Sequence, residues 1–113
     1  MEARQLKSVR QGDVCLIRIE TLPAGCTEVL PEGDRVVLAY GERTGHSHAV
    51  YGVTKEAPNV RLWSAGAERF LQVLTRSDLQ HEEHSTVVLE PGIYQLPGQY
   101  EFSEEHAPRQ VAD

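Results

Sequence analysis

The sequence lacks a long apolar run, and this excludes a class of proteins. Its 113 residues contain no stretch of 18 consecutive apolar side chains, so no segment is predicted to cross a membrane as a helix. The first twenty residues also lack the apolar centre of a secretory signal peptide. We therefore expect a cytoplasmic protein.

Basic residues are outnumbered by acidic ones. Eleven Lys and Arg stand against seventeen Asp and Glu, which gives a formal net charge of −6, and the arginines are scattered. Nucleic acids and anionic membranes are bound through clustered basic side chains. The charge balance therefore predicts no nucleic-acid or membrane partner, and it leaves a small molecule or another protein as the expected partner.

Cysteine is scarce as well. Cys15 lies in the apolar run V-C-L-I, and Cys26 lies in the turn-like segment P-A-G-C-T. Their spacing supports neither a disulfide nor a C-x-x-C redox or zinc motif. We expect both to be reduced thiols.

Short alternating segments dominate what is present, and no long amphipathic helix is visible. About eight strands separated by Gly and Pro turns predict an all-β domain, a small barrel or sandwich formed by the whole chain. The termini, 1–10 and 103–113, are predicted to be loose or to add short edges. At most one short helical turn is expected, in S-D-L-Q-H-E-E-H-S. The predicted strands are residues 13–20, 27–30, 35–40, 60–64, 69–75, 86–89, 93–96 and 99–102.

The first of these strands, residues 13–20, alternates between two sets of side chains. Cys15, Ile17 and Ile19 face one way, and the other face carries Arg18. We predict that the set without the charge faces the core.

Two histidines two residues apart form the strongest candidate site. In the segment G-E-R-T-G-H-S-H-A-V, an extended chain places His46 and His48 on one side and Ser47 on the other. Two imidazoles on one side of a strand can share a divalent transition metal such as Zn, Fe or Ni. The spacing therefore predicts a metal site, provided that another segment supplies further ligands.

His81 and His84, in H-E-E-H, are the candidate further ligands. A helical turn would put both on one face, whereas a strand would let only one join a common centre. Glu82 and Glu83 between them are possible carboxylate ligands or bases. The same text is also typical of a solvated turn, and it is not the H-E-x-x-H motif of zinc proteases.

Residues 36–102 resemble a degenerate small cupin. The first cupin motif resembles the segment around His46 and His48, although a glycine or valine stands where its glutamate is expected. The second resembles residues 89–102, L-E-P-G-I-Y-Q-L-P-G-Q-Y-E-F, with Glu101 in place of the histidine. This resemblance implies a β-barrel, and it implies Glu101 as a carboxylate ligand beside the two histidines.

A second resemblance is to small uncharacterised bacterial or phage-borne proteins that combine G-D-V, G-H-x-H, H-E-E-H and P-G-x-Y. It implies no activity, but it points to the same four histidines. The metal-ligand hypothesis thus comprises His46, His48, His81, His84 and Glu101.

Several functions remain open. The first is a metal-binding β-barrel protein with metal-dependent chemistry on a small molecule. The alternative is a non-enzymatic phage- or operon-encoded interaction or structural module without a metal. A histidine-based pH switch is a third possibility. A homodimer formed through an exposed strand fits the first two, and no catalytic residue is assigned.

Overall fold

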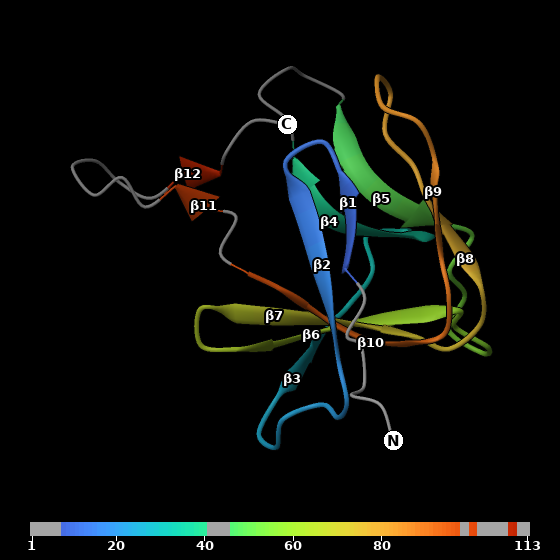
Figure 1. Ribbon diagram of the computed structural model, residues 1–113. Coiled ribbons are helices and arrows are strands. Elements are labelled where there is room, and N and C mark those ends of the chain that lie inside the picture. The colour runs from blue at the N-terminus through green and yellow to red at the C-terminus, as the bar shows by residue number, and fades with distance from the viewer. Residues whose placement is uncertain (1–7, 41–45, 98–99, 102–108, 111–113) are drawn as a thin grey trace, which may run out of the picture.

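Short β-strands build the part of the chain that the computed structural model describes, residues 8–40, 46–97, 100–101 and 109–110 (Figure 1). These residues contain no helix, and the predicted all-β class is confirmed. The strands are β1 (Ser8–Gln11), β2 (Val14–Ile19), β3 (Thr27–Val29), β4 (Arg35–Tyr40), β5 (Ser47–Tyr51), β6 (Val60–Ala65), β7 (Glu68–Val73), β8 (Ser77–Leu79), β9 (Val87–Leu89), β10 (Gly92–Leu96), β11 (Tyr100–Glu101) and β12 (Arg109–Gln110).

Antiparallel pairing joins these strands into one large sheet and three hairpins. The large sheet has the order β1-β2-β10-β7-β6-β3, and the two-stranded sheets are β4–β5, β8–β9 and β11–β12. An isolated bridge between Ala49 and Gln80 connects β5 to β8, and β9 in turn contacts β1. Because β1 and β3 remain the edges of the large sheet, the described strands do not close into a barrel.

The core lies between the large sheet and the β4–β5 and β8–β9 hairpins. Leu16, Leu38, Leu71, Leu79 and Leu89 are fully buried or nearly so, and each comes from a different strand. Burying a leucine side chain contributes about 1.5–3 kcal/mol. These residues therefore hold together strands that no continuous ladder of hydrogen bonds connects.

The predicted inward face of the first strand is wrong. Val14 and Leu16 are in the core, whereas Cys15 and Ile17 are partly exposed. Arg18 shares the core-facing side with Val14 and Leu16, and its guanidinium lies over the Tyr94 ring, 5.6 Å from the ring centre.

The predicted helical turn is absent from the described residues. Ser77–Leu79 forms β8, and residues 82–84 form bends before β9. The backbone of Gln80 exchanges two hydrogen bonds with Ala49, at 2.9 and 3.0 Å, and these keep the segment extended. Within the described ranges, no helix is long and apolar enough to span a membrane.

Two of the predicted strands, residues 60–64 and 69–75, pair as the β6–β7 hairpin, and its turn uses a positive φ of 64° at Gly66. Cys15 and Cys26 are free thiols.

Candidate metal centre

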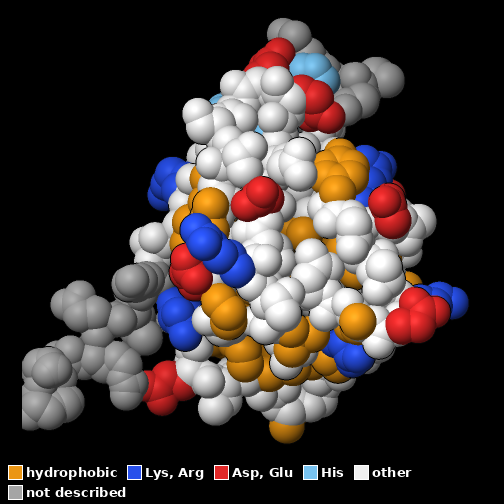
Figure 2. Space-filling model, turned by 90° about the vertical axis from the view of Figure 1, so that its right-hand side faces the viewer, with side chains coloured by type: hydrophobic (Ala, Val, Ile, Leu, Met, Phe, Trp, Pro, Cys, Tyr) orange, Lys and Arg blue, Asp and Glu red, His pale blue; other side chains and the backbone are white. Residues whose placement is uncertain are grey.

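Four histidine rings meet where the start of β5 faces the loop between β8 and β9. The ring centres of His48 and His81 are 4.2 Å apart, and those of His81 and His84 are 4.6 Å apart. The ring centre of His46 lies 5.7 Å from that of His81. Figure 2 shows histidine and acidic side chains gathered at one end of the molecule. The structure thus brings together all four histidines of the two sequence clusters.

The position of His48 follows from β5 and its pairing with β4. The register shifts between Val37 and Ala39, so Leu38 is the extra residue of a β-bulge opposite the histidine segment. Alternation along β5 then places the side chains of His48 and Val50 on the same side. Val50 belongs to the core cluster and His48 is fully buried. His48 therefore extends the core rather than facing solvent.

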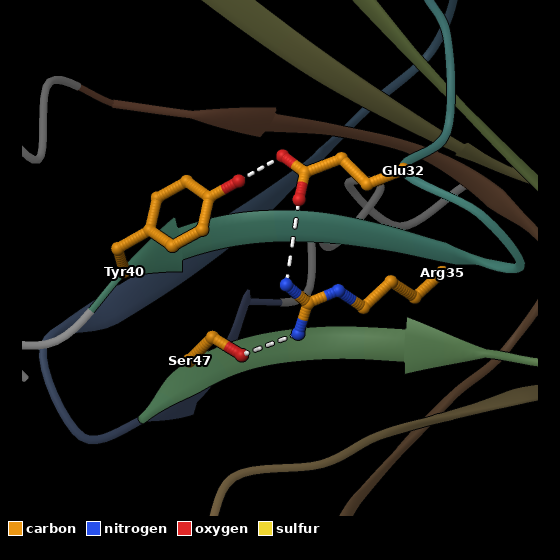
Figure 3. Close-up of polar contacts among 4 residues, drawn as sticks. All are labelled: Glu32, Arg35, Tyr40 and Ser47. Atoms are coloured by element: carbon orange, nitrogen blue, oxygen red, sulfur yellow. Dashed lines mark hydrogen bonds and ion pairs between the residues drawn. The ribbon is translucent and has the colours of Figure 1, made fainter. Parts of the chain in front are cut away.

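Ser47 connects the start of β5 to two other segments. Its hydroxyl accepts a hydrogen bond from Arg35 Nη1 at 3.4 Å, and Arg35 Nη2 donates to Glu32 Oε1 at 3.4 Å (Figure 3). The Tyr40 hydroxyl donates to the second oxygen of Glu32. On the backbone side, the N–H of Ser47 donates to Glu82 Oε1 at 2.9 Å. These contacts fix the residue that follows His46 in sequence.

The loop after β8 supplies a carboxylate and an imidazole. The hydrogen bond from the Ser47 N–H holds the pKa of the Glu82 carboxyl below its ordinary value, against a smaller effect of burial, and the carboxylate is therefore ionised at neutral pH. His81 is only 9% exposed. Its Nδ1 accepts a hydrogen bond from the N–H of Glu83 at 3.0 Å.

Three residues combine into a set of potential metal donors. One donor atom each from His46, His81 and Glu82 lies within 4.8 Å of the other two. His46 is 18% exposed, and its Nδ1 lies 3.9 Å from Glu83 Oε2. Two imidazoles and one carboxylate form a donor set that suits zinc or non-haem iron and leaves coordination positions open.

Two further residues, His84 and Glu101, are also predicted as ligands. The His84 ring packs against Gly12 through Nε2. A Cβ atom added at Gly12 would lie 2.6 Å from that nitrogen. That packing leaves Nε2 no room for a metal on the side of Gly12. Glu101 lies in β11, and its side chain falls outside the described residues. Its place as a ligand stays a prediction.

Gln11 belongs to the site, although no motif in its own segment indicates this. It is the last residue of β1 and only 3% exposed. Its amide oxygen lies 2.8 Å from His48 Nδ1, and its amide nitrogen donates to two backbone carbonyls. A glutamine before a Gly-Asp turn is typical of an exposed position. The packing of β1 against β9 buries this one.

Replacing Gly12 by alanine is expected to destabilise the fold more than the same change at Gly66. Both glycines have similar positive φ values, 57° and 64°, which cost alanine about 1–2 kcal/mol. Only at Gly12 does the new Cβ also collide with His84, whereas nothing lies within 4 Å at Gly66. Urea unfolding of both variants measures the difference, and equal losses would show that His84 does not pack on Gly12.

The chain was compared with known protein families, curated proteins and solved structures. Residues 10–99 match the model of a family described as a domain of unknown function, DUF8820. No curated protein and no solved structure matches the chain.

Proposed function

Since the chain belongs to the DUF8820 family, whose description names no activity, we propose from its own residues that it is a metal-binding protein. His46, His81 and Glu82 hold a divalent transition metal, preferably zinc or ferrous iron. The observation that carries this proposal is the convergence of their three donor atoms within 4.8 Å.

Binding an ion would draw the three donors closer together. Zinc lies about 2.0–2.2 Å from nitrogen and oxygen ligands in a tetrahedral arrangement, so two donors of one ion are about 3.4 Å apart. The separations in the structure are bounded by 4.8 Å, so the widest pair would close by up to about 1.4 Å. Rotations of the His46 and Glu82 side chains, which are the more exposed members of the set, would supply this closure.

Burial distinguishes this arrangement from a solvated turn. His48 is fully buried and His81 nearly so, at the point where two separate segments of the chain meet. Surface histidines in an acidic turn would not pack ring against ring in this way. The clustering therefore favours a built site over the alternative of a module whose histidines face solvent.

The surroundings suggest a small molecule as the ligand of the open positions. A cavity of about 310 Å³ is lined by Tyr51, Gln80, His81 and Glu82. Its size is at the lower end of the range for small-molecule pockets. A metal held by His81 and Glu82 would lie at the wall of this cavity, which is where a bound small molecule would meet it.

Zinc titration of metal-free, ¹⁵N-labelled protein tests the proposal. We expect one ion per chain by dialysis and elemental analysis, and a large shift of the Glu83 amide resonance. Coordination through His81 Nδ1 removes the acceptor of that N–H, and coordination through Nε2 moves the ring proton to Nδ1 with the same result. Glu82→Gln should weaken binding, because the amide is a poorer ligand than the carboxylate.

Glu28→Gln is the matched control. Glu28 lies in β3 and pairs with Arg61 at 3.9 Å, so its loss removes one negative charge away from the histidines. Equal weakening by both substitutions would indicate binding through net charge. Absence of stoichiometric zinc and of stoichiometric iron would overturn the proposal.

A further inference from the structure

The amide of Gln11 is held by three hydrogen bonds in a buried position. Its nitrogen donates to the carbonyl oxygens of Leu79 at 2.8 Å and of Ser85 at 2.9 Å. Its oxygen lies 2.8 Å from His48 Nδ1. Leu79 ends β8 and Ser85 precedes β9, so Gln11 joins both ends of the loop that carries His81 to the histidine of β5.

These contacts determine where the proton of His48 resides. Carbonyl oxygens only accept hydrogen bonds, so the end of the amide that faces Leu79 and Ser85 must be the NH₂ group. The end that faces His48 is then the oxygen, which also only accepts. His48 Nδ1 must therefore carry a proton, and in the neutral ring the lone pair is then on Nε2.

His81 has the opposite arrangement. Its Nδ1 accepts from the Glu83 N–H, so the proton of the neutral ring is on Nε2. Metal-binding histidines commonly donate one ring N–H to an outer partner and coordinate through the other nitrogen. His48 already donates its Nδ1–H to Gln11 in this way. In His81, the hydrogen bond that Nδ1 accepts from the Glu83 N–H would first have to break.

We propose that Gln11 is a positioning residue that fixes His48 as the Nδ1–H tautomer and so presets Nε2 as a further metal donor of the site. The part that concerns the metal rests on the proposed function. The part that concerns the tautomer does not, because it is a property of the metal-free protein. His48 lies outside the set of three converging donors, but its ring centre is 4.2 Å from that of His81, so it would be a fourth ligand beside them.

Long-range ¹H–¹⁵N correlation spectra of the metal-free protein test the tautomer directly. Wild type should show His48 protonated at Nδ1 and unprotonated at Nε2. Gln11→Met, which keeps the length of the side chain but offers no acceptor, should lose this preference. Gln11→Glu retains an acceptor opposite Nδ1 and should keep the preference, although it loses the two hydrogen bonds to Leu79 and Ser85. If neither variant folds, the wild-type spectrum alone carries the test.

Zinc affinity of the same variants tests the consequence. Loss of an outer partner of a ligand typically weakens metal binding by about 10- to 100-fold, and we expect this for Gln11→Met. Gln72→Met is the matched control, because Gln72 Oε1 likewise accepts from a ring N–H, that of Trp63 at 3.0 Å. It should bind zinc as wild type does.

The outcomes separate the two proposals. A His48 ring protonated at Nε2 alone in wild type, or an unchanged tautomer in Gln11→Met, overturns the role of Gln11. Zinc binding by Gln11→Met equal to that of wild type overturns the metal part of that role and leaves the proposed metal function standing. If His48 shows the expected tautomer but the protein binds no zinc, the proposed function is overturned. The role of Gln11 in fixing the His48 tautomer then stands.

Discussion

Zinc at 100 times its dissociation constant is expected to stabilise the protein by about 2.7 kcal/mol, because a ligand that binds only the folded state adds its binding free energy to folding. For a domain of this size that is a rise of roughly 10 °C in Tm. His46→Ala combined with His81→Ala should abolish the rise, since only Glu82 and His48 remain of the proposed ligands.

The physical reason lies in how the donors are distributed. His46 precedes β5 and His81 follows β8, two segments that are joined by the backbone bridge between Ala49 and Gln80 and by the hydrogen bond from the Ser47 N–H to Glu82. A bound ion would add a further connection between these segments that the unfolded chain cannot form.

Thermal unfolding followed by circular dichroism, with zinc and then with excess chelator, measures the effect. Magnesium is the control, because it prefers oxygen ligands and should shift Tm far less than zinc. An equal zinc-induced rise in the double variant would mean that the ion binds elsewhere on the chain.

Local spacing explains what the sequence could predict of the site. A two-residue interval predicts that His46 and His48 share one side of an extended segment. In the structure β5 begins at Ser47, so only His48 lies within the strand. Strands such as Arg35–Tyr40 and the β6–β7 hairpin were likewise predictable, because their alternation and turn residues are local signals. The meeting of the two histidine clusters remained a hypothesis, since it depends on the long-range bridge between β5 and β8.

Tertiary context explains what could not be predicted. Gln11 is buried only because β9 and the loop before it pack over the end of β1. The inward face of β2 was misassigned because Arg18 can share the core side, where it lies over Tyr94. Both features depend on partners far away in sequence. Neither residue type carries a signal for them within its own segment.

Leu38→Ala is expected to cost about 2–5 kcal/mol of unfolding free energy, the range for a leucine removed from a tightly packed core. Leu38 is fully buried at the bulge of β4 beside the pairing of Ala39 with His48, and its carbonyl accepts a hydrogen bond from Arg69 Nη2 at 2.8 Å. Domains of this kind are stable by about 5–15 kcal/mol, so the variant loses a large share of the total.

Leu30→Ala makes the same chemical change at a residue that is 73% exposed, and it should cost no more than about 0.5 kcal/mol. Urea unfolding measures both variants, and an unchanged slope with denaturant shows that the midpoints can be compared as stabilities. The difference depends on Leu38 filling the space between the β4–β5 hairpin and the large sheet. Similar midpoints for the two variants would contradict that packing, and with it the bulge that adjoins the β5 histidine segment.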